Sequence, residues 1–166
     1  MSRLILNDSY DRDFKKYWDL WNPPVPLADS WLFLKAQCYA ESAFKDTAVS
    51  PVGAKGLCQF MDPTWGQYGI GDPFNSEANI NAAARYMSVL IDGWNSERPI
   101  EDKYKLAQAS YNAGFGNLLK AQKKCSNNVL YDEIVPCLIK VTGRHSEETI
   151  MYVKRIWKGY YILLIG

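Results

Sequence analysis

Apolar residues recur with helical spacing along most of the chain. In residues 8–21 the aromatic side chains fall at i, i+4, i+7, i+8 and i+11, on one face of a helix: Tyr10, Phe14, Tyr17, Trp18 and Trp21. A stripe of this kind is more typical of a packing face than of a binding surface. The same period predicts further helices over about residues 30–44, 76–94, 100–113, 117–123 and from about 146 onward.

The predicted helix over residues 30–44 is apolar on almost every side, which is typical of a central helix. It carries one acid, Glu41, near its end, and a turn with several glycines follows it. Two interpretations of this acid are open. Glu41 is either a solvent-facing acid that pairs with Lys45 at i+4, or an acid held at the edge of a cleft.

The segments between the predicted helices lack a regular period. Residues 45–56 are expected to form an irregular loop, residues 57–68 a short helix broken near Pro63, and residues 125–145 a loop. No run of alternating polar and apolar residues indicates strands. The predicted fold is therefore mainly α, with at most a small β element in the 45–75 region.

The length of 166 residues favours one domain that is large enough for a sizeable core. We expect a single domain over residues 1–166. Within it, residues 1–28 form an N-terminal helix and a proline-rich connector, and residues 29–166 form the core of the domain.

Charge and cysteine content narrow the range of functions. The formal net charge is +1, so no strong positive field indicates binding to nucleic acid. His145 is the only histidine and no CxxC pair occurs, so we expect no zinc site, and no other metal or cofactor. Cys38 and Cys58 lie in apolar segments and are interpreted as small buried hydrophobes. Cys125 and Cys137 flank a short segment and are the favoured pair if a disulfide forms.

No targeting or membrane-spanning segment is visible in the sequence. Only Leu4, Ile5 and Leu6 follow Arg3 before polar residues begin, which is far short of the apolar region of a signal peptide. The apolar tail over residues 160–165 is too short to cross a bilayer. We therefore expect synthesis in the cytoplasm and no stable insertion into a membrane.

Four short motifs, in a consistent order, resemble those of one enzyme family. They are ES-x-F at residues 41–44, S-x-x-GA-x-GL-x-Q-x-M at 50–61, SYNAG (for the family's AYNAG) at 110–114, and ET-x-x-YV at 148–153. The chain is thereby similar to the soluble lytic transglycosylases, a branch of the lysozyme superfamily. It departs from the family pattern at Asp62, which holds a proline position, and at Trp65, which holds an alanine position.

The resemblance implies a lysozyme-like, α-helical fold and cleavage of the β-1,4 bond between N-acetylmuramic acid and N-acetylglucosamine in peptidoglycan. In the family one glutamate protonates the leaving oxygen and then takes the proton of the C6 hydroxyl, which closes a 1,6-anhydro ring. Carried over, Glu41 is that acid and base. Met61 matches a substrate-contacting position, and the positions that line or order the cleft are matched by Ser50, Gln59, Tyr111, Asn112 and Glu148.

Several matched residues also have a purely structural interpretation. Asn112 could end a helix with Tyr111, Gln59 could satisfy loop backbone, and Glu148 could interact with a helix dipole. Ordinary glycosidases use two carboxylates, and here the only candidate for a second one is Asp46, in the loop after Glu41. The missing second acid favours ring closure over hydrolysis.

The sequence therefore predicts a single-domain lytic transglycosylase that acts on peptidoglycan strands as a monomer. The small size and the absence of a visible signal favour a bacteriophage endolysin or a virion-associated enzyme. Such an enzyme would reach the periplasm and the cell wall through a holin, or would be carried in the virion. The alternatives are a hydrolytic muramidase of the same fold, and a non-catalytic glycan-binding or tail-structural module.

Overall fold

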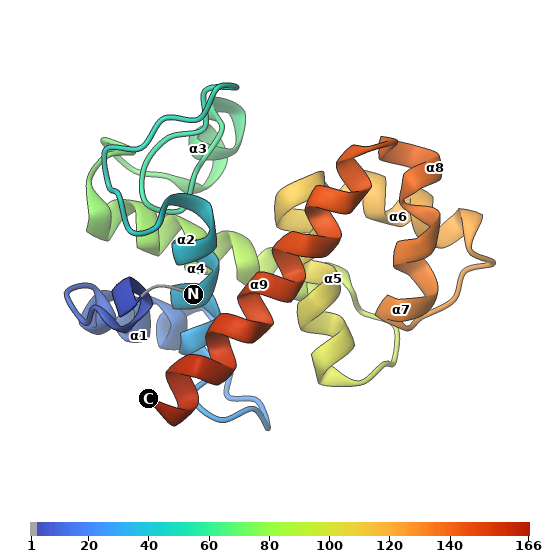
Figure 1. The fold of residues 1–166 in the computed structure, drawn as a ribbon, viewed down its shortest axis with the longest axis horizontal. Helices are drawn as coiled ribbons and strands as arrows, with labels where there is room; N and C mark the ends of the chain where they lie inside the picture. The colour runs from blue at the N-terminus through green and yellow to red at the C-terminus, as the bar shows by residue number, and fades with distance from the viewer. Residues whose placement is uncertain (1–2) are drawn as a thin grey trace. The chain divides into compact units, whose positions relative to one another are not determined.

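The computed structural model describes residues 3–166, and its regular structure is almost entirely helical (Figure 1). The helices are, in chain order, η1 (Arg3–Leu6), α1 (Asp11–Trp21), α2 (Trp31–Ser42), α3 (Asp62–Tyr68), α4 (Ser76–Gly93), α5 (Ile100–Ala113), α6 (Phe115–Lys124), α7 (Tyr131–Ile134), η2 (Val135–Cys137), α8 (Ile139–Thr142) and α9 (His145–Ile165). Within the described residues, β pairing is limited to two isolated antiparallel bridges, Val49 with Lys55 and Lys55 with Phe60. The predicted mainly α fold with a small β element is confirmed.

The helices belong to two compact units. The first holds the residues up to Tyr86 together with Arg155–Gly166, and the second holds Met87–Lys154. Helices α4 and α9 contribute residues to both units. The expectation that residues 1–166 make up one catalytic domain stays a prediction.

The core of the first unit is built from aromatic side chains of α1, α2 and α9. Helix α1 packs against α2 and buries Phe14 and Trp18, so the predicted packing role of this stripe is confirmed at these two positions. On α2, Phe33 stacks on Tyr160 with ring centroids 3.7 Å apart and contacts Trp157 at 4.7 Å. Burying such large rings supplies much of the free energy that holds α2 in the interior.

The second unit is organised around α5 and α6, which pack against each other, while α6 also contacts α7, η2 and α8. Its fully buried side chains include Leu106, Leu118, Ile134 and Leu138. A disulfide between Cys125 and Cys137 joins the end of α6 to η2, with Cα atoms 5.8 Å apart. The pairing that the sequence favoured here is confirmed.

Two expectations about local structure are wrong, and proline is involved in both. The 125–145 segment is not a loop but holds α7, η2 and α8, whose turns are too short for a helical period to stand out. Pro136 lies in the first turn of η2, and Pro63 lies in the first turn of α3. A proline in the first turn loses no intrahelical hydrogen bond, so Pro63 begins a helix instead of breaking one.

Tyr131 in the second unit gives a stability prediction. Its hydroxyl is buried without a hydrogen-bond partner among residues 3–166, and burial raises the pKa of Tyr131 above the ordinary tyrosine value. We expect Tyr131→Phe to raise the free energy of unfolding by about 1 kcal/mol, because an unpaired buried hydroxyl is removed. The matched control is Tyr160→Phe. The Tyr160 hydroxyl donates to the carbonyl of Ala28 at 2.5 Å. Removing this hydrogen bond should lower the free energy of unfolding by about 1 kcal/mol.

The pH dependence of stability gives a second readout of the same change. A raised folded-state pKa of Tyr131 means that the contribution of the neutral phenol is complete below the unfolded value of about 10 and is lost as pH rises above it. The advantage of Tyr131→Phe should therefore grow above about pH 10. Denaturant unfolding at neutral and alkaline pH measures both effects, and a Tyr131→Phe protein less stable than wild type would contradict the prediction.

Candidate active site

Glu41 lies in the last turn of α2, and the helix ends sooner than its apolar pattern predicts. Helix α2 is buried over residues 32–38, and the side chain of Glu41 is half-buried. The predicted helix end near Phe44 is wrong, because Ala43 and Phe44 have φ angles of 52° and 64°. Left-handed backbone costs non-glycine residues roughly 1–2 kcal/mol each. The carboxylate is therefore presented at a helix end and not along a helix.

Packing of the Phe44 ring compensates for this unfavourable backbone. The ring lies 5.2 Å from that of Tyr39 and 6.1 Å from those of Tyr10 and Phe14. In addition, the N–H of Ala43 donates to the carbonyl of Tyr39 at 2.8 Å. Tertiary contacts with α1 thus fix the point at which the chain leaves α2, directly after Glu41 and Ser42.

The segment after α2 contains the two isolated bridges and carries Ser50, Gln59 and Met61. The N–H of Ala54 donates to the Ser50 hydroxyl at 3.0 Å, so Ser50 orders the turn and keeps its own hydroxyl proton for another acceptor. The side chain of Met61 is 42% exposed just before α3. An exposed thioether at this position is free to contact a ligand.

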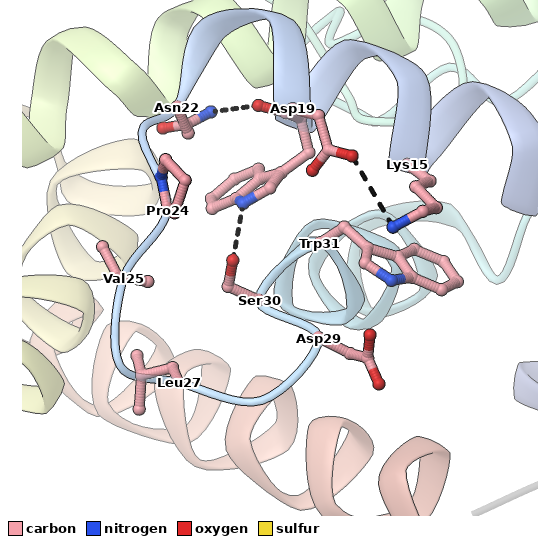
Figure 2. Close-up of a pocket in the computed structure, with 10 residues that line it drawn as sticks. Lys15, Asp19, Asn22, Pro24, Val25, Leu27, Asp29, Ser30 and Trp31 are labelled. Atoms are coloured by element: carbon pink, nitrogen blue, oxygen red, sulfur yellow. Dashed lines mark hydrogen bonds and ion pairs between the residues drawn. The ribbon is translucent and has the colours of Figure 1, made fainter.

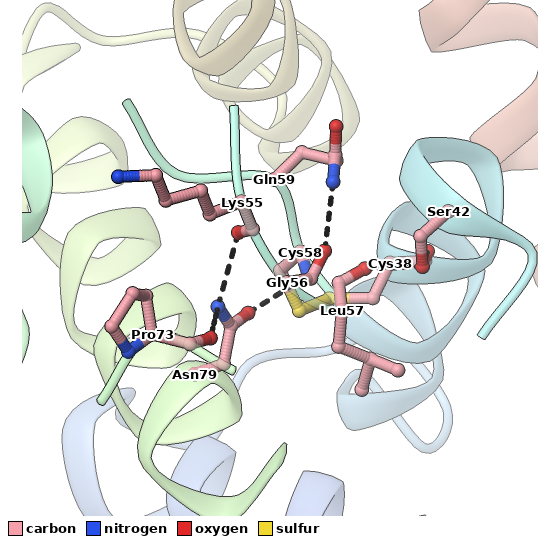
Figure 3. Close-up of a disulfide and its surroundings, with 9 residues drawn as sticks. All are labelled: Cys38, Ser42, Lys55, Gly56, Leu57, Cys58, Gln59, Pro73 and Asn79. Carbon is pink, nitrogen blue, oxygen red and sulfur yellow. Dashed lines mark hydrogen bonds between the residues drawn. A yellow bond between two sulfur atoms is a disulfide. The ribbon is translucent and has the colours of Figure 1, made fainter. Parts of the chain in front are cut away.

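Gln59 uses its side-chain amide to hold the backbone of its own loop. The Nε2 group donates to the carbonyl of Gly56 at 2.9 Å and to that of Ala48 at 3.2 Å. Its own backbone is left-handed, with φ 55°. The structural role considered for Gln59, hydrogen bonding to loop backbone, is therefore filled by its amide nitrogen. In Figure 3 the amide oxygen points away from the Gly56 carbonyl that the nitrogen contacts.

The loop is fastened to α2 by two neighbouring contacts (Figure 3). The Ser42 hydroxyl donates to the carbonyl of Leu57 at 2.6 Å, and Cys38 forms a disulfide with Cys58 across Cα atoms 4.4 Å apart. The interpretation of Cys38 and Cys58 as unpaired buried hydrophobes is wrong. Both are fully buried, but they are bonded, because the fold brings the loop against the one face of α2 that carries both Cys38 and Ser42.

Asn79, at the start of α4, is a residue of this site that the sequence analysis missed. It is fully buried, accepts from the N–H of Cys58 at 2.8 Å, and donates to the carbonyl of Pro73 at 2.8 Å. Gly56 lies so close that a Cβ would stand 2.3 Å from the same Pro73 oxygen. The available signal was a lone amide on the apolar face of the predicted helix, one turn before Ala83.

The second unit holds the remaining predicted site residues. Asn112 lies near the end of α5, and its Oδ1 accepts from the hydroxyl of buried Thr149 on α9 at 2.7 Å. Glu148 is exposed in the first turn of α9, with an oxygen 4.0 Å from Nδ1 of His145. A pocket of about 380 Å³ is lined by Asn112, Ala113, Asn117, Val141, Thr142, His145, Glu148 and Thr149.

The structure therefore gathers the predicted residues into two groups. Ser50 and Gln59 belong with Glu41 to the first unit, where the loop is bonded to the helix that carries the acid. Asn112 and Glu148 share a pocket in the second unit. Half-buried Tyr111 lies on α5 beside Asn112 but does not line that pocket.

Comparison with known families identifies the kind of domain that carries these two sets of residues. Residues 28–131 match the family described as the transglycosylase SLT domain. The chain belongs to this family. The match contains Glu41, the 50–61 segment and the 110–114 segment. It ends before Glu148, whose assignment rests on the ET-x-x-YV resemblance alone.

Relatives of this SLT chain carry related names. A membrane-bound lytic murein transglycosylase F from Idiomarina loihiensis is 35% identical over 92 residues, which is 55% of this chain and 20% of that protein. The protein of that name from Desulfosudis oleivorans is 29% identical over 148 residues, or 80% of this chain and 33% of that protein. The chain thus spans a fifth to a third of these two relatives.

Solved structures share the fold of the SLT chain. The 70-kDa soluble lytic transglycosylase of Escherichia coli has a TM-score of 0.69 at 24% identity, over 96% of this chain and 25% of that one. An inactive mutant of the Pseudomonas aeruginosa enzyme has a TM-score of 0.70 at 23% identity, over 94% and 24%. The lysozyme-like, all-helical fold that the motifs implied is confirmed.

A second pocket lies around the start of the SLT match at residue 28, and seven of its ten lining residues precede that match (Figure 2). Its volume is about 250 Å³, and it is lined by Lys15, Trp18, Asp19, Asn22, Pro24, Val25, Leu27, Asp29, Ser30 and Trp31. Two pairs of its polar groups interact with each other: Lys15 meets Asp19 at 3.6 Å, and the Trp18 indole donates to Ser30 at 2.9 Å. None of the predicted site residues lines it.

Among residues 3–166, no cluster of three or more His, Cys, Asp and Glu side chains could hold a metal ion. Over the same residues, no helix has the length and apolar character needed to cross a membrane. The expectation of a reaction without metal or cofactor stays a prediction.

Proposed function

We propose that this chain is a peptidoglycan lytic transglycosylase, and that Glu41 is its single acid and base. The observation that carries the proposal is the SLT family match over residues 28–131, a range that includes Glu41. The position of Glu41 in the last turn of α2, a helix bonded to the following loop, supports its proposed role. The printed names of the relatives, lytic murein transglycosylases, support the same substrate and reaction.

The proposed reaction needs one carboxyl group that gives and takes a proton in turn. Glu41 protonates the glycosidic oxygen as the bond to C1 of the muramoyl residue breaks. The resulting carboxylate then accepts the proton of the C6 hydroxyl, whose oxygen closes the 1,6-anhydro ring on C1. A carboxyl at a helix end, next to residues that are bonded to the neighbouring loop, suits both steps because proton transfer demands fixed geometry.

We assign the other predicted residues to substrate contact. Met61 offers an exposed apolar surface, and the Ser50 hydroxyl keeps a proton to donate. In the second unit, Asn112 and Glu148 present amide and carboxylate groups to one pocket. Such groups suit the hydroxyl and acetamido groups of a glycan strand. Tyr111 and Gln59 complete the proposed set.

The test is the identity of the product. Purified peptidoglycan is digested with the protein, and the muropeptides are analysed by mass spectrometry. Ring closure predicts products ending in 1,6-anhydromuramic acid, one water lighter than products of hydrolysis. Reducing-end muramic acid as the main product would identify a hydrolytic muramidase. Binding without cleavage would identify a glycan-binding module.

Glu148→Gln tests whether this exposed acid contacts substrate. Because the side chain is exposed beside the pocket, we expect the free energy of unfolding to fall by less than about 1 kcal/mol, the size of a helix-dipole contribution. Loss of a charged hydrogen bond to substrate should lower kcat/KM by roughly 10–100-fold. Glu147→Gln is the matched control, because Glu147 is exposed in the same helical turn but does not line the pocket. Equal kinetic losses in the two variants would contradict the assignment.

The biological setting stays a prediction from the sequence. A monomeric state, a bacteriophage origin as an endolysin or virion enzyme, and export through a holin belong to this proposal. So does action at the cell wall. The family match supports peptidoglycan as the substrate that would be met there.

A further inference from the structure

Glu41 occupies a position that a helix by itself would not hold still. It is the second-last residue of α2, and the two residues after Ser42 are left-handed. The final turn of a helix frays readily because its carbonyl groups lack intrahelical partners. A catalytic carboxyl placed there needs bonds from outside the helix to keep a fixed position.

Two such bonds reach α2 on one face and end on adjacent loop residues (Figure 3). Cys38 and Ser42 stand four residues apart and therefore share a face of the helix. Cys38 is bonded to Cys58, and the Ser42 hydroxyl donates to the carbonyl of Leu57 at 2.6 Å. Glu41 lies between these two attachments in the sequence, so both attachments restrain the turn that carries it.

The loop end of this connection is itself immobilised from α4. Asn79 accepts from the N–H of Cys58 and donates to the carbonyl of Pro73, both at 2.8 Å. Gly56 packs so closely against Asn79 and Pro73 that no side chain would fit there. Restraint on the last turn of α2 therefore runs through the Cys38–Cys58 disulfide to a buried, hydrogen-bonded part of the fold.

We propose that Cys38 and Cys58 are positioning residues for Glu41, and that their disulfide is required for full turnover. This inference rests on the proposed function and adds control by the oxidation state of the site. A dithiol reductant supplies two electrons and two protons, the S–S bond becomes two thiols, and the reductant becomes a disulfide. The last turn of α2 then loses its covalent link to the loop and keeps the hydrogen bond of the Ser42 hydroxyl to Leu57. Turnover falls, while the glycan contacts proposed for the second unit are unaffected.

The chain provides a matched control in its other disulfide. Cys125 and Cys137 close a segment with a sequence separation of 12, against 20 for Cys38 and Cys58, and they lie in the second unit. The entropic stabilisation from a disulfide changes only slowly with loop length. Removing either bond should therefore lower the thermal midpoint by a similar amount, and only one of them should alter the chemistry at Glu41.

The experiment compares two double variants with wild type. One combines Cys38→Ala with Cys58→Ala, and the other combines Cys125→Ala with Cys137→Ala. Steady-state kinetics on peptidoglycan and amide hydrogen exchange at residues 57–59 are measured for each. We expect the first variant to lose between about tenfold and 10²-fold in kcat, with KM changed less than about threefold, and to exchange these amides faster. The variant with Cys125→Ala and Cys137→Ala should keep the wild-type kcat and the wild-type exchange rates at residues 57–59.

Reduction of the wild type provides a second, reversible measurement. The protein is refolded with a dithiol, assayed, and assayed again after reoxidation, and kcat should fall and then return. Equal losses of kcat in the two double variants, or unchanged exchange at residues 57–59, would overturn the positioning role. So would unfolding of every reduced or substituted form, since the bond would then serve stability alone. If oxidised wild type does not cleave peptidoglycan, the proposed function fails, and the exchange data still decide the positioning role.

Discussion

Glu41→Gln is expected to lower the rate of peptidoglycan cleavage by about 10²–10⁴-fold, the contribution of general acid-base catalysis. This corresponds to roughly 3–5 kcal/mol of activation barrier. Glutamine keeps the shape of the side chain but can neither donate nor accept the proton that the reaction moves twice. Initial rates of release of anhydro-muropeptides measure the effect.

The variant should remain folded and should still bind the glycan. Glu41 is only half-buried in the last turn of α2, so an isosteric amide disturbs little of the packing around it. Thermal unfolding and peptidoglycan pull-down check these two properties. Wild-type rates in Glu41→Gln would remove Glu41 from the site altogether.

Asp46→Asn is the matched control for Glu41→Gln. Asp46 is half-buried in the loop after α2 and is the acid that a two-carboxylate hydrolase would need near Glu41. A single-acid mechanism predicts that Asp46→Asn keeps its rate within a few-fold of wild type. A loss as large as that of Glu41→Gln would favour the hydrolytic muramidase.

Asn79→Ala is expected to lower the free energy of unfolding by about 3–5 kcal/mol. The substitution leaves the buried N–H of Cys58 and the part-buried carbonyl of Pro73 without their partner. Each unsatisfied buried group costs about 1–3 kcal/mol, and the cavity left by the amide adds to this. The free energy of unfolding of a native protein is typically about 5–15 kcal/mol, so this loss would be a large part of it. Denaturant unfolding measures it.

Asn81→Ala, on the same helix, is the matched control. Asn81 is half-buried and accepts from the indole of Trp21 at 2.7 Å in an exposed setting. Water can replace this hydrogen bond, so the loss should stay near or below about 1 kcal/mol. Equal losses in the two variants would show that Asn79 is not a special anchor of the loop.

Local information in the sequence was sufficient to predict the mainly helical fold and to single out Glu41 as the candidate acid. The helical period places α4 and α5 almost at their observed ends, because burial of one face imposes that period directly on the residues. Glu41 stood out because the residues from 41 to 61 form a contiguous motif. A contiguous motif is a property of the chain and can be found without knowing the fold.

The contacts that hold Glu41 were decided by tertiary structure alone. No glycine or asparagine marks the end of α2, and Ala43 and Phe44 become left-handed only because the Phe44 ring packs among Tyr10, Phe14 and Tyr39. Such packing joins segments far apart in the sequence, so no local pattern records it.

The same reason explains the partners of Cys38 and Asn79. A cysteine in an apolar segment has the same local pattern whether it is bonded or free, and Cys38 pairs with Cys58 only because the loop folds back on α2. Asn79 interrupts an apolar helix face without any visible cause until the loop backbone lies against it. The sequence determined the main helices and the candidate acid, because periodicity and motif are local. The packing of distant segments determined the contacts that surround the helix turn carrying that candidate.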